Sequence, residues 1–153
     1  MNIANSTTFQ SITLTLLRVV AGLLYMQHGA QKLFGVLGGF GGEPGATAPL
    51  FSLMGLAGVL EFFGGLAIVV GLLTRPVAFV LAGEMATAYF VLQHLPQGFW
   101  PILNGGEPAL LYLVIFLYLV AHGAGGLSLD ALLDQQQEGV LRDVDTIQGR
   151  KER

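Results

Sequence analysis

Four long apolar segments dominate this sequence and constrain its fold more than any other feature. They cover about residues 11–34, 50–73, 76–95 and 107–124. A helix of about 20 residues crosses the hydrocarbon core of a bilayer, so each segment is long enough to be a membrane span. Hydrophobic residues make up 53% of the 153 residues and charged residues only 11%, which is too apolar for an ordinary soluble domain. We therefore expect an all-α, transmembrane four-helix bundle.

Glycine, proline and aromatic residues mark the ends of these segments. A glycine-rich loop follows the first segment, and so much glycine is incompatible with regular helix throughout. Proline disfavours helical geometry in the residue before it, so Pro76 ends the second segment and suits the first position of the third. Phe99 and Trp100 precede the fourth segment, where aromatic side chains anchor a loop at headgroup level.

The last 27 residues differ sharply from the rest, because residues 127–153 hold ten of the seventeen charged residues. We expect two parts: a transmembrane domain over residues 1–126, and a charged tail over 127–153 that is partly helical or disordered. Arg75 lies in the turn between the second and third spans, and four more basic residues lie in the tail. The positive-inside rule then predicts a multi-pass protein of the cell (plasma or inner) membrane with both termini in the cytoplasm.

Composition also excludes several classes of function. The chain has no cysteine, which rules out disulfides, thiol relays and cysteine-ligated metal or iron–sulfur sites. Its net charge of −3 lies mostly in the tail, so no basic surface indicates nucleic-acid binding. Residues 1–13 contain no Lys or Arg, so we interpret the first apolar segment as a retained span rather than a cleaved signal peptide.

Glu61 and Glu84 lie near the middle of their predicted spans, and Arg18 lies in the cytoplasmic half of the first span. A charge at the bilayer centre costs roughly 2.5 to 3.5 kcal/mol on insertion scales, so these side chains should face the bundle interior or each other. We predict an Arg18–Glu61 pair, which either belongs to a polar functional site or only fixes helix register. Glu84 lies nearly opposite a ridge of alanines, so it faces a second helix, faces a partner subunit, or is protonated.

A second group of polar residues lies at the outer end of the spans. His28 and Lys32 are one helical turn apart, and Glu107 opens the fourth span on the same side. Such a cluster can bind a small anion or a quinone carbonyl; alternatively Lys32 snorkels to the interface and Glu107 only stabilises its helix N-terminus. Haem would need His28 and His94 at one depth on facing helices, and we favour interfacial roles for both.

Several motifs, in this order, resemble the DoxX family of small four-span membrane proteins. They are His-Gly-Ala-Gln-Lys-Leu-Phe-Gly at 28–35, Gly-Val-Leu-Glu-Phe-Phe-Gly-Gly at 58–65, Gly-Leu-Leu-Thr-Arg at 71–75, Asn-Gly-Gly-Glu at 104–107 and Ser-Leu-Asp at 128–130. The resemblance covers roughly residues 14–133 and implies the fold more than an activity, because the family is functionally diverse. A related branch is the membrane subunit of a thiosulfate:quinone oxidoreductase. The resemblance adds Glu61 and Asn104 to His28 and Lys32 as candidate site residues.

Three functions are compatible with these features. The first is a membrane subunit of a redox-linked complex that contacts a quinone or small anion. No motif for NAD, flavin or a metal is present, so a soluble redox partner would supply the electrons, and a quinone is the one cofactor we consider. The second is a scaffold that recruits soluble proteins through its tail. The third is a small-molecule transporter, which four spans would support only as a homo-oligomer.

Overall fold

The computed structural model describes residues 3–92 and 95–151, and within these ranges it contains helices and loops but no strand. The first span is one long helix, α1 (Ile3–Phe34). The second is a continuous rod made of α2 (Leu53–Val59), a π-helical turn η2 (Leu60–Gly64) and α3 (Gly65–Val70). The third begins as α4 (Thr74–Thr87) and continues into a π-helical turn, η3 (Ala88–Leu92). The expected all-α architecture is confirmed.

The remaining elements are shorter, apart from the tail. Two 3-10 turns, η1 (Phe40–Gly42) and η4 (Leu95–Gln97), and a single helical turn, α5 (Pro101–Asn104), lie in the two long loops. The fourth apolar segment forms α6 (Glu107–His122), which ends two residues earlier than expected because Gly123 has a φ of 78°. The tail forms one long helix, α7 (Leu129–Lys151), where a partly helical or disordered segment was expected.

By length and composition, three of the described helices can cross a membrane: Thr8–Phe34, Leu53–Val70 and Thr74–Gln97. Helix α6 is also apolar, but it has only 16 residues. The chain is therefore a multi-pass membrane protein that contacts the lipid bilayer.

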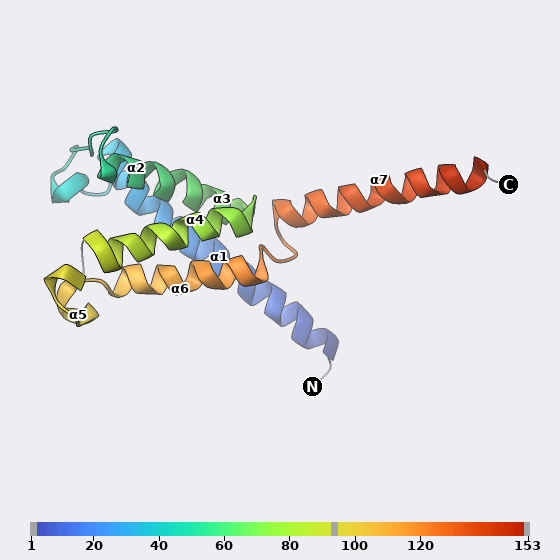
Figure 1. Cartoon of the computed structure of the whole chain (residues 1–153), viewed down its shortest axis with the longest axis horizontal. Helices are drawn as coiled ribbons and strands as arrows, with labels where there is room; N and C mark the ends of the chain where they lie inside the picture. Colours follow the sequence, from blue (N-terminus) through green and yellow to red (C-terminus); the bar gives the residue numbers. More distant parts are fainter. Residues whose placement is uncertain (1–2, 93–94, 152–153) are drawn as a thin grey trace.

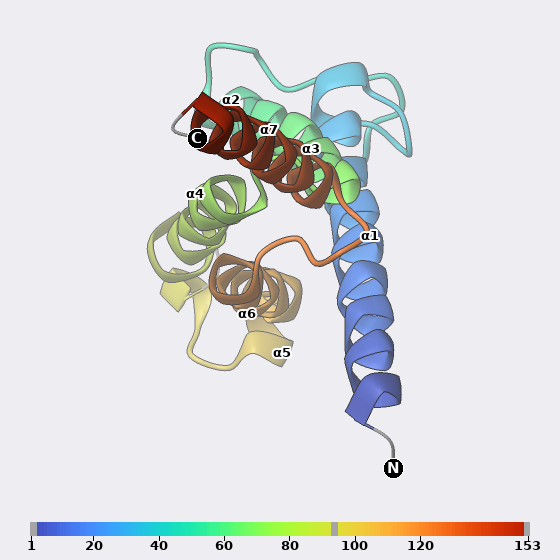
Figure 2. The same ribbon diagram turned by 90° about the vertical axis from the view of Figure 1, so that its right-hand side faces the viewer.

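The helices run back and forth between two ends of the molecule. In Figure 1 the N-terminus, the turn between α3 and α4, and the start of α7 lie toward one end, while the loop after α1 and the loop containing α5 lie at the other. Helices α4 and α6 lie side by side, and α1 packs along the second rod but crosses α6 at a steep angle (Figure 2). The start of α1 and the start of α7 therefore lie toward the same end of the molecule.

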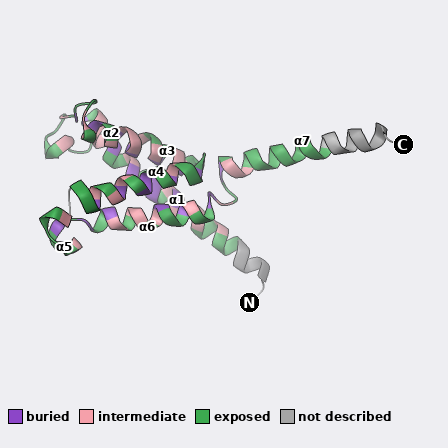
Figure 3. Ribbon diagram, in the orientation of Figure 1, coloured by how far each residue is buried: buried purple, intermediate pink, exposed green. Residues whose placement is uncertain are grey.

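The core lies where α1, α3, α4 and α6 meet. Buried residues follow the inner faces of these helices, and the outer faces are exposed (Figure 3). Tyr25 packs edge-on against Tyr112 and Phe116, with ring centroids 5.0 and 4.8 Å apart. Other fully buried side chains of the core are Ile68, Ala78, Leu81 and Leu119.

A glycine allows α1 to approach the second rod closely. A Cβ atom on Gly29 would lie 2.3 Å from the backbone nitrogen of Phe62, so only glycine fits at this crossing. Small residues at membrane helix interfaces permit this kind of approach. The contact places the C-terminal third of α1 directly against η2. This close approach determines which charged residues of the two helices can meet.

The predicted Arg18–Glu61 pair is wrong. Arg18 is 1% exposed, and its Nη atoms donate to the carbonyls of Ile68 and Val69, both at 2.6 Å, and of Leu127 at 2.7 Å. Ile68 and Val69 lie in the last turn of α3, where carbonyl groups attract a cation, and Leu127 lies just before α7. Arg18 therefore closes the end of a helix and ties the tail to the bundle.

Asp130 strengthens this connection. Its carboxylate accepts hydrogen bonds from the backbone nitrogens of Leu73 at 2.7 Å and Thr74 at 2.9 Å, which start α4. Ser128 accepts from the nitrogen of Ala131 and so caps α7. The first turn of α7 is thus fixed to the bundle, and the rest of the helix projects away from it (Figure 1).

Candidate functional site

A cavity of about 490 Å³ lies between α1, α2, η2, α4 and α6. Most of its wall is apolar and comes from leucine, methionine, alanine and valine side chains. Its ionisable lining residues are Tyr25, His28, Lys32, Glu61, Glu84 and Tyr112. Three of the four elements that supply these residues are parts of helices long enough to span a membrane, so this polar group lies among the spans.

An ion pair between Lys32 and Glu61 dominates the cavity. The ammonium group of Lys32 donates to both carboxylate oxygens of Glu61. The side chains are 19% and 6% exposed, respectively. The pair is therefore largely withdrawn from solvent, while Lys32 keeps some access to the cavity.

The direction of the two helices explains why Glu61 meets Lys32 rather than Arg18. In a helix each Cα–Cβ bond tilts toward the N-terminus, and α1 runs antiparallel to the second rod. The side chains of Lys32 and Glu61 therefore tilt toward each other, whereas that of Arg18 tilts away from Glu61. Val69, which binds Arg18, lies eight residues beyond Glu61, or about 12 Å along the helix.

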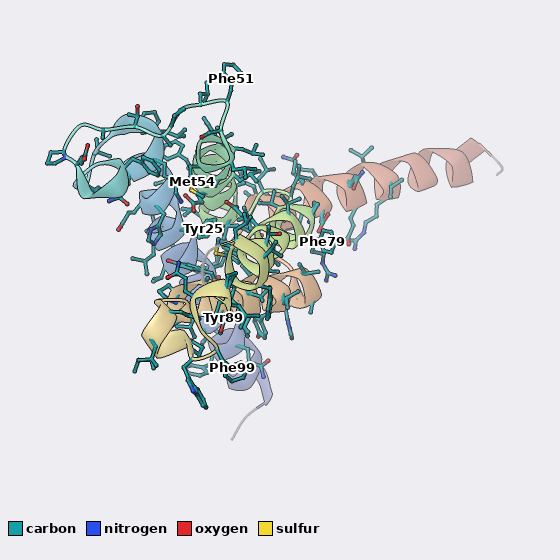
Figure 4. The ribbon with its side chains drawn as sticks, turned by 60° about the vertical axis from the view of Figure 1, so that its left-hand side comes forward. Tyr25, Phe51, Met54, Phe79, Tyr89 and Phe99 are labelled. Atoms are coloured by element: carbon teal, nitrogen blue, oxygen red, sulfur yellow. The ribbon has the colours of Figure 1, made fainter. Side chains whose placement is uncertain are left out.

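A second pair of polar groups in the cavity joins α1 to α4. The hydroxyl of Tyr25 donates to Oε2 of Glu84 at 2.9 Å. The other oxygen, Oε1, is buried and has no hydrogen-bond partner among the described residues. The sequence left open whether Glu84 faces a second helix or a partner subunit, and the structure places it toward the cavity. Figure 4 shows Tyr25 in the middle of the helices, whereas Phe51 and Phe99 point outward from the loops.

The structure brings together only part of the predicted outer cluster. His28 lines the cavity, with its ring edge-on to Tyr112 at a centroid distance of 6.3 Å. Glu107 is exposed and lines a different hollow, an apolar groove of about 660 Å³ between α1 and α6. Pro108 and Tyr112 of α6 line both hollows, whereas His28 and Lys32 line only the cavity with Glu61 and Glu84, and Glu107 lines only the groove.

Asn104 also lies outside the cavity and holds the loop before α6. Its side-chain nitrogen donates to the carbonyl of Gly98 at 2.6 Å, and its oxygen accepts from the backbone nitrogen of Gly106 at 2.8 Å. Among the described residues, no group of three or more His, Cys, Asp or Glu side chains is arranged to hold a metal. His94, the second residue of the haem hypothesis, lies outside the described residues.

Sequence reasoning missed Tyr25 as a site residue, although a signal was present. Tyr25, His28 and Lys32 are spaced i, i+3 and i+7, which places all three on one face of α1. Tyr112 had no comparable signal, because nothing in its neighbourhood distinguishes the inner face of the uniformly apolar α6. Its contact with the cavity depends on how α6 packs.

Together these features define a multi-pass helical membrane protein with a charged cavity among its spans. The model of the DoxX family matches residues 13–94, more than half of the chain and the part that carries His28, Lys32, Glu61 and Glu84. The chain belongs to the DoxX family. It is also 41% identical over 128 residues to an uncharacterized protein of Haemophilus influenzae, covering 82% of this chain and 94% of that one. No solved structure matches the chain.

Proposed function

We propose that the chain is the membrane subunit of a redox-linked complex and that its cavity binds the headgroup of a quinone. The observation that carries this proposal is the Lys32–Glu61 pair in an otherwise apolar cavity between spans. A ligand that reaches this place from the bilayer must be lipophilic, and a ligand that contacts these side chains must also have polar atoms. A quinone has both properties.

The polar lining supplies the groups that a quinone headgroup needs. Its two carbonyl oxygens accept hydrogen bonds, for which the Lys32 ammonium and the His28 ring are donors. The apolar walls exclude water and so strengthen these interactions. Leucine and methionine side chains of α2 provide a flat, adaptable surface for the ring.

Electrons would have to come from another polypeptide, because the sequence has no motif for a flavin, a nicotinamide or a metal. The start of α7 is fixed to the bundle by Arg18 and Asp130, and the rest of the helix extends away from it. We propose that α7 is the element on which a soluble redox protein docks.

For the membrane arrangement, we propose that α6 is the fourth span and that both termini lie in the cytoplasm of a cell whose plasma or inner membrane holds the protein. A cysteine placed at Gln136 should react with an impermeant thiol reagent only after the membrane is opened. One placed at Gly42 should react in intact cells. The reverse pattern would invert the orientation.

The binding proposal is tested with purified protein in nanodiscs and a short-chain alkyl benzoquinone. The double variant Lys32→Met/Glu61→Leu removes both charges without leaving either one unpaired, so the fold is preserved while the donor is lost. We expect its affinity for the quinone to fall at least about tenfold, because the variant loses one good hydrogen bond to a charged group. The control variant Glu107→Gln, in the separate groove, should bind as the natural protein does. Equal affinity of all three proteins would refute the quinone site.

A non-catalytic scaffold is the second candidate, and the fixed, projecting α7 is the observation that favours it. This function would require the tail but not the cavity. In cells, Lys32→Met/Glu61→Leu would then keep the cellular activity of the natural protein, whereas deletion of residues 132–153 would abolish that activity. The redox function predicts that each of the two changes abolishes the cellular activity.

A further inference from the structure

We propose that Glu84 is the proton-carrying group of the cavity, which holds an exchangeable proton on Oε1. This inference extends the proposed function, but only its last step rests on it. Two independent observations support it: the balance of charge inside the cavity, and the hydrogen bonding of the two oxygens of Glu84.

The charge balance leaves no cation for Glu84. Among the described residues, Lys32 is the one lysine or arginine that lines the cavity, and its ammonium group contacts both oxygens of Glu61. The titratable groups around Glu84 are Tyr25, His28 and Lys32 on α1, Glu61 on η2 and Tyr112 on α6. An unpaired carboxylate among apolar spans is so unfavourable that such a group normally becomes neutral by binding a proton.

The hydrogen bonds assign the proton to one oxygen. Oε2 accepts from the hydroxyl of Tyr25, which is the role of the carbonyl oxygen of a neutral carboxyl group. Oε1 is buried and receives no hydrogen bond from the described residues. An ionised oxygen there would need a donor, whereas the O–H group of a neutral carboxyl needs only an acceptor, which a ligand or water in the cavity can supply. The neutral carboxyl therefore carries its hydrogen on Oε1.

The location of this proton gives it a function. Glu84 and the Lys32–Glu61 pair line the same cavity, so a ligand bound beside Lys32 also lies near the Glu84 carboxyl. A quinone oxygen that gains negative charge as electrons arrive from the partner protein would take the proton from Glu84. Glu84 would then be reloaded from water.

A lipophilic carbodiimide, dicyclohexylcarbodiimide, tests the inference directly, because it adds to a protonated carboxyl in an apolar environment. We expect the purified natural protein to gain one adduct, which peptide mass spectrometry should locate at Glu84. The yield should fall as the pH rises, since the ionised carboxyl does not react. Glu84→Gln should gain no adduct, and the control Glu107→Gln should be labelled as fully as the natural protein.

Two results would overturn the inference: no adduct at Glu84 at any pH, or equal labelling of Glu61, which would mean that the two carboxyls are not different. The mapping of the natural protein decides the question even if Glu84→Gln does not fold.

Labelling of Glu84 without quinone binding would leave the proton site intact and refute the proposed function. Quinone binding without labelling of Glu84 would leave the proposed function intact and refute the proton site. If bound benzoquinone protects Glu84 from labelling, the proton site and the quinone site share the cavity.

Discussion

Breaking the Lys32–Glu61 pair from one side should cost much more stability than removing it entirely. Lys32→Met keeps the length of the side chain but leaves the Glu61 carboxylate, 6% exposed, without a cation. Removing one partner of a buried pair typically costs about 3 to 5 kcal/mol. Glu61→Leu should cost less, about 1 to 3 kcal/mol, because Lys32 is 19% exposed and its flexible stem can carry the ammonium group toward the interface.

The double variant Lys32→Met/Glu61→Leu should recover most of this loss. Replacing a buried ion pair by apolar side chains of similar size is often close to neutral, so we expect the double variant within about 1 kcal/mol of the natural protein. The free energy of interaction between the two sites is then about 3 kcal/mol or more. This recovery is also what makes the double variant suitable for the quinone-binding experiment.

The measurement is reversible unfolding of the four proteins of this cycle in detergent micelles, followed by circular dichroism. Glu107→Gln, which changes an exposed residue outside the cavity, is the control and should alter stability by less than about 0.5 kcal/mol. If the effects of the two single substitutions add, with an interaction below about 0.5 kcal/mol, the pair does not stabilise the fold and the reasoning fails.

Three further substitutions test the packing around the site, each by the shift in unfolding free energy. Arg18→Leu strips three backbone carbonyls of their donor and should cost about 3 to 5 kcal/mol, with only partial recovery in Arg18→Lys. Asp130→Asn weakens the charged cap of α4 and should cost about 1 kcal/mol; no change would remove Asp130 from this role. Gly29→Ala should cost at least about 2 kcal/mol, in the upper half of the usual overpacking penalty, because its Cβ would meet backbone atoms, whereas Gly83→Ala should be neutral or stabilising.

The apolar segments and their ends were predictable because length and glycine or proline punctuation are local properties. The first span was expected to end at residue 34, and α1 ends at Phe34. The second was expected over residues 50–73, and its helical rod occupies Leu53–Val70 between a Ser52 cap and the left-handed Gly71. The resemblance to the DoxX family was also confirmed.

The pairing of charged residues was not predictable from depth alone. Arg18 and Glu61 were matched because both lie inside spans, but the tilt of Cβ atoms along antiparallel helices favours Lys32 as the partner of Glu61. That rule could have been applied to the sequence. The separation of Glu107 from His28 could not have been predicted from the sequence, because it depends on the angle at which α1 crosses α6.

The charged residues of the spans differ in the kind of partner they have, and this difference separates structure from function. Arg18 directs its guanidinium at three backbone carbonyls that every copy of the fold must satisfy, so its role is structural. Lys32 and Glu61 instead neutralise each other at the edge of a cavity, and Glu84 keeps one oxygen without a protein partner. A fold that needed only to fix helix register would not need a third ionisable group beside a balanced pair. This difference supports our proposal that the functional site is the cavity and does not include Arg18.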